Sequence, residues 1–201
     1  MKKNLMRLAL VALAVVCSLQ ASAQNEVKSW EFEAKVGATY PLQKFAGSKT
    51  VGPLLGLEVR RNLESLPVDV GAEIYVGSAC YDVEEVPFIA DDTQSNRTFS
   101  LAVVGDYNFL RGTKVSPFVG LGLGLGFNDA VLGCDTDEGS SFVVTPRVGV
   151  ELFSHLRLSV EGRFSRKHYH TVGLSVGFVI GGGRKSVLHR KVGNGKTCGL
   201  R

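Results

Sequence analysis

The stretch Phe118–Phe127, FVGLGLGLGF, decides the fold, because every second residue within it is glycine. The residues between the glycines are Val119, Leu121, Leu123 and Leu125. A period of two is typical of a β-strand, whose successive side chains point to opposite faces. One face of this strand is therefore apolar, and the other is made of glycine. In a small membrane barrel the apolar face meets lipid and the glycine face meets a narrow lumen.

The N-terminus predicts export from the cytoplasm. Residues 1–23 resemble a secretory signal peptide, with a basic start, the apolar run Leu8–Leu19 and the small residues Ala21-Ser22-Ala23 before the expected cleavage point. The run is shorter than the roughly 20 apolar residues of a transmembrane helix. Residues 24–181 then form one predicted barrel domain. Residues 182–201 are a basic tail, predicted to be disordered, although it could touch anionic lipid headgroups.

Seven further segments alternate in the same way, so the chain is predicted to be all-β. Short connections alternate with longer ones, such as 41–51, 78–96 and 128–140. This is the pattern of an eight-stranded antiparallel up-and-down transmembrane β-barrel, with short periplasmic turns and longer outer loops. The expected strands are 30–40, 52–62, 68–77, 97–109, one beginning near 115, 141–152, 155–164 and 169–180.

A soluble barrel that carries a lipid in an apolar interior would show the same alternation, so two further features are needed to choose between them. Aromatic residues share the apolar parity and concentrate near the expected strand ends, which is where the aromatic girdles of a membrane barrel lie. Charges of opposite sign also fall on the polar face at facing positions, which suits a closed lumen. The predicted girdle is Trp30, Tyr40, Phe99, Tyr107, Phe109, Phe127, Phe142, Phe164 and Phe178, and the predicted lumen pairs are Arg147 with Glu161, Glu151 with Arg157, and Arg60 with Asp69.

The segments SPFVGLGLGLGF and TPRVGVELFSHLRLSVEGRFS, with the leader and the eight strands, resemble the small outer-membrane β-barrel family, which includes OmpA-type, OmpX-type and opacity-type proteins. The resemblance extends over residues 30–180. It implies the outer membrane as location, no wide pore, and a structural, adhesion or surface-interaction role. The implied partners are outer-membrane lipids, lipopolysaccharide, a surface or host ligand, and the barrel-assembly machinery, which reads a terminal aromatic residue such as Phe178.

The remaining candidate sites are weaker. Cys80 and Cys134 fall in or beside outer loops and could form a disulfide or remain separate thiols. His168 and His170 could form a metal half-site, or a lipid-modifying hydrolase pair with Ser165, but no third partner is evident, so a polar rim and no enzyme are expected. The acidic outer loops match no calcium-binding motif. A net charge near +1 after removal of the leader gives no reason to expect nucleic acid, and no cofactor motif is present.

Overall fold

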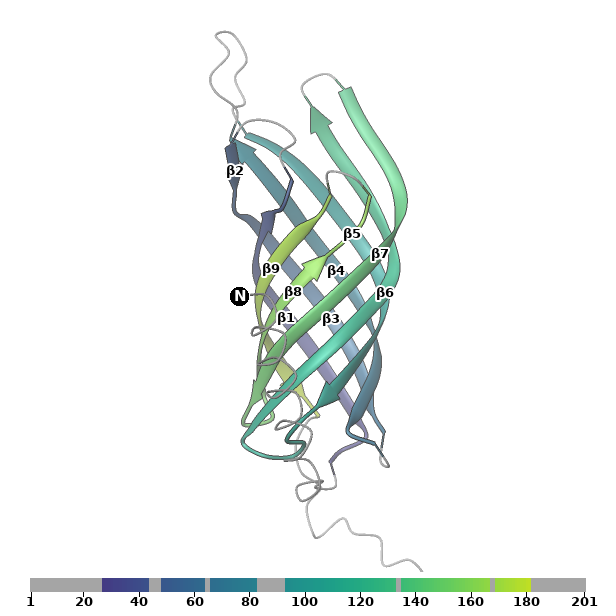
Figure 1. Ribbon diagram of the computed structural model, residues 1–201, viewed down its shortest axis with the longest axis vertical. Coiled ribbons are helices and arrows are strands. Elements are labelled where there is room, and N and C mark those ends of the chain that lie inside the picture. Colours follow the sequence, from purple (N-terminus) through teal and green to yellow (C-terminus); the bar gives the residue numbers. More distant parts are fainter. Residues whose placement is uncertain are drawn as a thin grey trace, which may run out of the picture.

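The computed structural model describes residues 27–43, 48–63, 66–82, 93–132, 135–166 and 169–181. Within these ranges the chain forms nine strands and no helix, and it is drawn from the side in Figure 1. The strands are β1 (Trp30–Pro41), β2 (Ser48–Thr50), β3 (Gly52–Asn62), β4 (Val68–Asp82), β5 (Thr93–Asn108), β6 (Val115–Leu132), β7 (Asp135–Leu152), β8 (Leu156–Arg163) and β9 (Thr171–Ile180).

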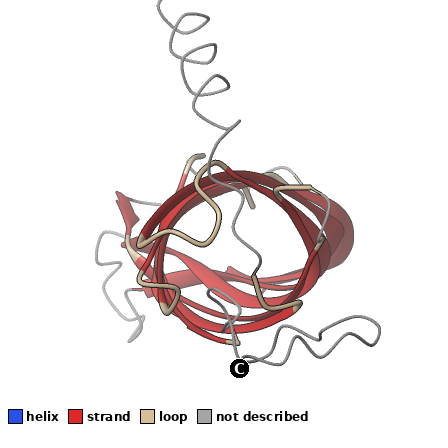
Figure 2. Cartoon of the chain, turned by 90° about the horizontal axis from the view of Figure 1, so that it is seen from below, coloured by secondary structure: helices blue, strands red, loops and turns tan. Residues whose placement is uncertain are grey.

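Eight of these strands close into a barrel. Neighbours in the sheet follow the order β4-β3-β1-β9-β8-β7-β6-β5, and a further pairing of β4 with β5 joins the two ends. Every pairing is antiparallel, from the β1–β3 ladder through to the β8–β9 ladder. The short β2 only adds three residues to the edge of β4. Seen along its axis, the molecule is a closed ring of strands (Figure 2). The predicted eight-stranded up-and-down barrel is confirmed.

The two faces of each strand differ as the glycine stretch predicts. Leu121, Leu123 and Leu125 of β6 are 48%, 45% and 56% exposed on the outer wall. Large apolar residues of the other barrel strands are also exposed, whereas the buried residues are largely polar or charged. A soluble lipid carrier would have the opposite arrangement, with its apolar face lining the interior. Such an outer wall is suited to lipid, and the lipid-carrier interpretation is wrong for this chain.

Four strands run further than the alternation predicted. β4 continues to Asp82 and β5 begins at Thr93, so the connection between them is only 83–92. β6 and β7 form a long hairpin whose register continues to the pair Leu132 and Asp135, where the sequence suggested a loop over 128–140. Figure 1 shows this hairpin reaching beyond β8 and β9. The regular alternation of apolar and small or polar residues ends there, whereas the backbone ladder continues.

The two ends of the barrel are unlike. One end, called the turn end, contains the starts of β1 and β4 and the end of β9. It also contains the connections 63–67, 109–114 and 153–155. The other, called the loop end, carries the longer connections and the β6–β7 extension. The turn from β7 to β8 is tight, because Phe153 and Ser154 both adopt positive φ angles of 54° and 61°. No helix in the described ranges is long and apolar enough to span a membrane.

Candidate functional site

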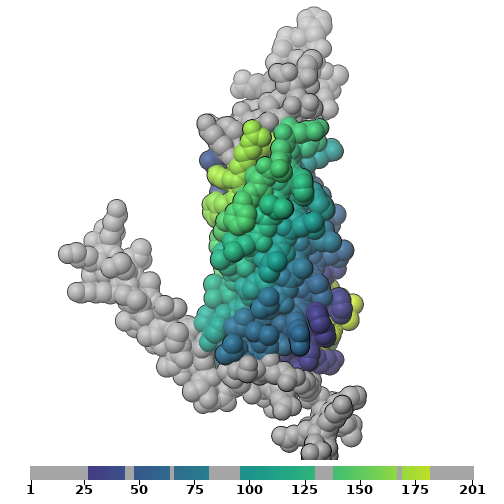
Figure 3. Space-filling model, turned by 90° about the vertical axis from the view of Figure 1, so that its right-hand side faces the viewer, coloured from purple at the N-terminus to yellow at the C-terminus, as the bar shows by residue number. Residues whose placement is uncertain are grey.

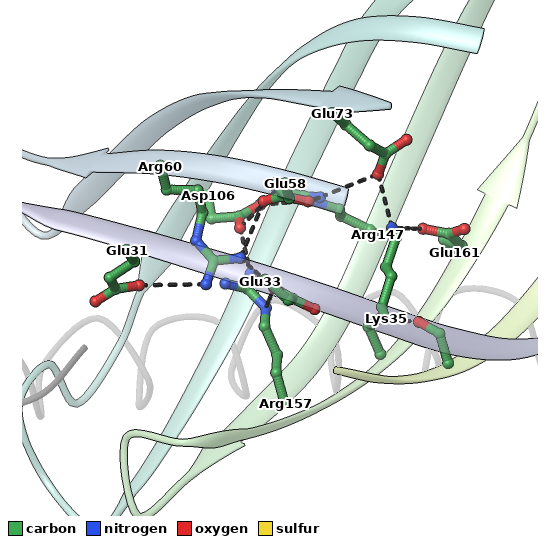
Figure 4. A network of polar contacts seen from close by, with 12 residues as sticks. Glu31, Glu33, Lys35, Glu58, Arg60, Glu73, Asp106, Arg147, Arg157 and Glu161 are labelled. Carbon is green, nitrogen blue, oxygen red and sulfur yellow. Dashed lines mark hydrogen bonds and ion pairs between the residues drawn. The ribbon is translucent and has the colours of Figure 1, made fainter. Parts of the chain in front are cut away.

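The lumen is filled by charged side chains that are almost completely buried. They come from six strands, β1, β3, β4, β5, β7 and β8, and meet near the middle and turn end of the barrel (Figure 4). Isolated ions at such depth would be costly, so each must find partners of opposite charge. The members are Glu31, Glu33, Lys35, Glu58, Arg60, Glu73, Asp106, Arg147, Arg157, Glu161 and Arg163.

Arg60 organises the part of this network nearest the turn end. Its guanidinium lies 2.5 Å from Glu33, 2.9 Å from Glu58 and 3.2 Å from Glu31. Glu31 also accepts a hydrogen bond of 2.7 Å from Asn62 Nδ2. One guanidinium thus holds three carboxylates of β1 and β3 together, and its planar set of five N–H donors suits that task better than a lysine would.

Arg147 of β7 crosses the lumen and links β3 with β5. Its Nη1 and Nη2 donate to the two oxygens of Glu58 at 2.5 and 2.8 Å. Its Nε and Nη2 donate to the two oxygens of Asp106 at 2.7 and 2.8 Å. Asp106 is also bound by Arg157 of β8, whose guanidinium lies 3.6 Å from the centre of the Phe118 ring. These bidentate, charge-assisted bonds are of the strong kind.

A second centre lies further toward the loop end. Lys35 Nζ of β1 is 2.7 Å from Glu73 of β4 and 2.9 Å from Glu161 of β8. Arg163 donates to Glu73 at 2.7 Å and to the hydroxyl of Ser100 at 2.7 Å. The Arg163 guanidinium also lies 3.4 Å from the centre of the Tyr75 ring, which contributes a cation–π contact.

The inward glycines provide the space for these side chains. A Cβ built on Gly120 would overlap the carboxylate of Asp106, and one on Gly56 would come within 2.6 Å of the Lys35 side chain. A Cβ on Gly177 would overlap the carboxylate of Glu33 in the same way. On the glycine face predicted from the sequence, Gly120 lies against the charged side chain of Asp106, whereas a Cβ on Gly122 or Gly126 would meet Thr145, Val104 or Val143.

Two of the three predicted lumen pairs face one another in the register, and the third does not. Arg147 is opposite Glu161, and Glu151 is opposite Arg157. The short ion pairs of Arg147 are nevertheless made across the lumen, because its long side chain reaches beyond its neighbouring strand.

The predicted pairing of Arg60 with Asp69 is wrong. The β3–β4 turn is longer than assumed, so that Asn62 is opposite Asp69 and Arg60 is opposite Gly71. Asp69 instead accepts a hydrogen bond of 2.5 Å from Asn108 and lies 3.8 Å from the guanidinium of Arg111.

The predicted girdle residues are all exposed or half-exposed, and they lie at two levels along the barrel axis. The Phe99 and Phe127 rings are 6.1 Å apart, and Phe142 and Phe164 follow on the next strands. The sequence placed these rings at strand ends, but Phe99, Phe127 and Phe142 lie inside β5, β6 and β7, because the ladders continue past them. Phe164 directly follows the end of β8. The loop-end set is Tyr40, Phe99, Phe127, Phe142 and Phe164, and the turn-end set is Trp30, Tyr107, Phe109 and Phe178.

The distance between the two levels suits a membrane. Trp30 and Tyr40 are ten residues apart on β1. At about 3.4 Å per residue and a strand tilt of about 40°, they are separated by about 25 Å along the barrel axis, which is the height of the apolar band in outer-membrane barrels. The girdle itself stays an interpretation of this placement.

The residues considered for catalysis do not form a hydrolase site in the described ranges. Ser165 Oγ lies 2.5 Å from Ser141 Oγ, and it is the backbone N–H of Ser165 that donates to His170 Nδ1, at 3.2 Å. His168 and Cys134 lie outside the described residues, so the Cys80–Cys134 disulfide stays a prediction. Within the described ranges no three His, Cys, Asp or Glu side chains form a metal-binding group. The leader, the tail and most loop acids also lie outside those ranges.

The sequence prediction missed several members of the network. Lys35, Glu58, Glu73, Asp106 and Arg163 were not named as site residues, although each has the inward parity of its strand. Parity could have identified them as lumen residues. Their partners could not be found in the same way, because ion pairs across the lumen depend on the closed barrel and on side-chain length.

An apolar outer wall around a buried ionic lumen defines a membrane-spanning β-barrel. Comparison with known families agrees. The model of the outer membrane protein beta-barrel domain family matches residues 9–181, and the chain belongs to this family. The protein is therefore a small outer-membrane β-barrel, with its turn end toward the periplasm and its loop end toward the cell exterior. No curated protein matches the chain.

Among solved structures, Neisserial surface protein A has a TM-score of 0.53 and 13% identity, covering 77% of this chain and 98% of that one. The N-terminal barrel domain of Pseudomonas aeruginosa OprF has a TM-score of 0.48 and 20% identity, covering 78% and 100%. The attachment invasion locus protein Ail of Yersinia pestis has a TM-score of 0.48 and 14% identity, covering 77% and 99%. At 13% identity the likeness to Neisserial surface protein A concerns the fold alone.

Proposed function

We propose that this barrel is a surface-interaction protein, in which the transmembrane wall serves as an anchor and the loop end contacts ligands outside the cell. The observation that carries the proposal is the closed lumen. The ionic network occupies its middle and turn end, and the buried side chains of Leu54, Tyr75 and Val143 occupy positions nearer the loop end. The cavity at the turn end, lined in part by Glu31 and Asp69, has a volume of about 10 Å³, room for one water molecule.

A general porin needs a wide aqueous passage, which an eight-stranded barrel with a filled interior does not offer. The proposal includes no enzymatic activity, because the hydrogen-bond partners described for Ser165 Oγ are Ser141 and Asn128 rather than the His170 ring. What remains to carry function is the part beyond the membrane. The β4–β5 and β6–β7 ladders both continue past the loop-end aromatic level, so they extend the sheet above it. Adhesion to other cells or to host surfaces is the role that such a platform fits.

The β6–β7 extension allows a clean test. Asn128 is opposite Gly139 in the register, and Phe127 is opposite Ser140. Deletion of residues 129–138 therefore leaves Asn128-Gly139 as a two-residue turn, and Asn-Gly is the favoured sequence for such hairpin turns. The barrel should still insert and resist unboiled detergent on a gel, because all transmembrane pairs remain.

The deletion protein and the full chain would be expressed at equal outer-membrane levels in cells that lack the gene. We expect adherence to epithelial monolayers and cell–cell aggregation to fall to the level of the empty strain. A deletion within 83–92, the connection between β4 and β5, shows whether that loop is needed as well. Unchanged adherence for both deletions, or discrete large conductance steps from the full chain in planar bilayers, would contradict the proposed role.

A further inference from the structure

The outer wall of β5, β6 and β7 carries a groove of about 580 Å³ at the loop end. The face to which it belongs is turned toward the viewer in Figure 3, in teal and green. Phe99 and Phe127 line the groove on its membrane side, and Leu101 and Leu125 follow them down the wall, 47% and 56% exposed. The groove therefore begins where the lipid-facing surface ends, at the level of lipid headgroups rather than of acyl chains.

A row of three charged residues lies directly beyond the two phenylalanines. Arg97 is opposite Asp129 in the β5–β6 ladder, and Asp129 is opposite Glu138 in the β6–β7 ladder. Each residue is two positions beyond the row Phe99, Phe127 and Ser140, so it shares the outward parity and lies about 7 Å further along its strand. All three residues line the groove.

The charges of this row are not paired with other described side chains of the protein. Among the described side chains, no ion pair within 4.0 Å involves Arg97, Asp129 or Glu138. Asp129 Oδ1 is shielded from solvent and has no hydrogen-bond partner among the described groups. Two carboxylates at directly facing positions of a sheet repel each other. The carboxylates of Asp129 and Glu138 therefore have no cationic partner among the described side chains. The guanidinium of Arg97, which lies beside them, has no anionic partner there either.

We propose that this groove binds a phosphate group of lipid A, the phosphorylated glycolipid of the outer leaflet, together with a divalent cation. Arg97 donates to the phosphate oxygens, a geometry that suits the planar guanidinium. The cation lies between the phosphate and the carboxylates of Asp129 and Glu138. Two carboxylates do not complete the oxygen shell of Ca²⁺, which takes six to eight ligands, so phosphate oxygens and water supply the rest.

Charge and position both favour this occupant. With a divalent cation and a phosphate monoanion bound, the net charge of the groove is zero. The acyl chains of the same molecule then lie on Phe99, Phe127 and the leucines beneath them, which a free phosphate ion would leave uncovered. The inference shares with the proposed function only the outward orientation of the loop end, and it requires no adhesive ligand.

The test uses the full mature chain in detergent micelles, with diphosphoryl lipid A as the probe and native mass spectrometry to measure the bound fraction. Binding should be stronger with Ca²⁺ than with a chelator, and stronger than for dephosphorylated lipid A or phosphatidylglycerol. Loss of a charge-assisted phosphate contact predicts that Arg97→Gln weakens binding by about tenfold or more. The double variant Asp129→Asn, Glu138→Gln should bind equally with and without Ca²⁺.

Arg61→Gln is the matched control. Arg61 is exposed, and its guanidinium lies 5.8 Å from the centre of the Trp30 ring. The substitution therefore removes the same charge beside an aromatic residue, but at the opposite end of the barrel. This variant should bind lipid A like the wild type. The inference would be overturned if Arg61→Gln and Arg97→Gln lost the same affinity for lipid A, or if phosphatidylglycerol bound as strongly as lipid A. It would also be overturned if the double variant matched the wild-type affinity both in Ca²⁺ and in chelator. If the protein stays folded in detergent on an unboiled gel but does not bind lipid A in this way, the adhesion proposal remains intact.

Discussion

Arg147 is the side chain whose removal tests the ionic lumen most directly. Arg147→Leu deletes four charge-assisted hydrogen bonds, two to Glu58 and two to Asp106. Glu58 keeps its contact of 2.9 Å with Arg60, and Asp106 keeps Arg157, so neither carboxylate loses every partner. Removal of one member of a buried ion pair typically costs about 3–5 kcal/mol, and we expect a loss in this range.

The measurement is urea unfolding in lipid vesicles, followed by the fluorescence of Trp30, the only tryptophan of the chain. With a urea dependence of about 2 kcal/mol per M, a loss of about 4 kcal/mol lowers the unfolding midpoint by about 2 M. The triple variant Arg147→Leu, Glu58→Gln, Asp106→Asn leaves no charge without a partner at this crossing, and it should recover about half of the loss or more.

Arg61→Leu is the control for removal of an arginine from the outer surface, where loss of an exposed cation–π contact costs about 1 kcal/mol or less. If Arg147→Leu loses no more than this control, the lumen is hydrated and its ion pairs contribute as little as surface pairs do. The explanation of the closed lumen given above would then be refuted.

Three further predictions concern the wall and the loop end. Gly124→Ala should cost about 1–3 kcal/mol in the same urea assay, because the new Cβ would meet the backbone of β5. Gly105→Ala should change stability by less than about 0.5 kcal/mol, because its new Cβ would come no closer than 3.9 Å to the Asp69 carbonyl oxygen; equal effects of the two substitutions would contradict the packing. Leu123→Arg on the lipid face should cost about 2–4 kcal/mol in vesicles, and a smaller loss would place this residue away from the bilayer midplane. Peptide mapping without reduction should show Cys80 linked to Cys134, and alkylation of both thiols in the protein isolated from the outer membrane would exclude that bridge.

The sequence was sufficient to predict the barrel, because its main signal is local. The alternation of Leu121, Leu123 and Leu125 with glycine requires a strand whose two faces meet different surroundings, and seven other segments repeat the pattern. The strand ends were predicted less well. Beyond Phe99 and Phe127 the next outward residues are the charged Arg97 and Asp129, so the period-two signal is interrupted, although backbone pairing does not depend on side-chain polarity.

The candidate site was only partly predictable for a related reason. Adjacent-strand pairs such as Arg147 and Glu161 follow from register, and register follows from turn length. One misjudged turn was enough to misplace Arg60 relative to Asp69. Contacts across the lumen, such as Lys35 with Glu73, depend on the diameter of the closed ring, which no segment of the sequence encodes by itself.

The ion pair between Lys35 and Glu161 joins residues 126 positions apart, on the first and the eighth strand in chain order. It exists only when β1 and β9 have paired and the ring is complete. A half-assembled sheet in the membrane would turn Lys35, Glu73 and Arg163 toward lipid or water without their partners. We expect such intermediates to be disfavoured, so that closure of the β1–β9 seam is coupled to formation of the lumen ion pairs. Variants that weaken these pairs should therefore accumulate as unassembled periplasmic chains, in addition to the loss of stability expected for the finished barrel.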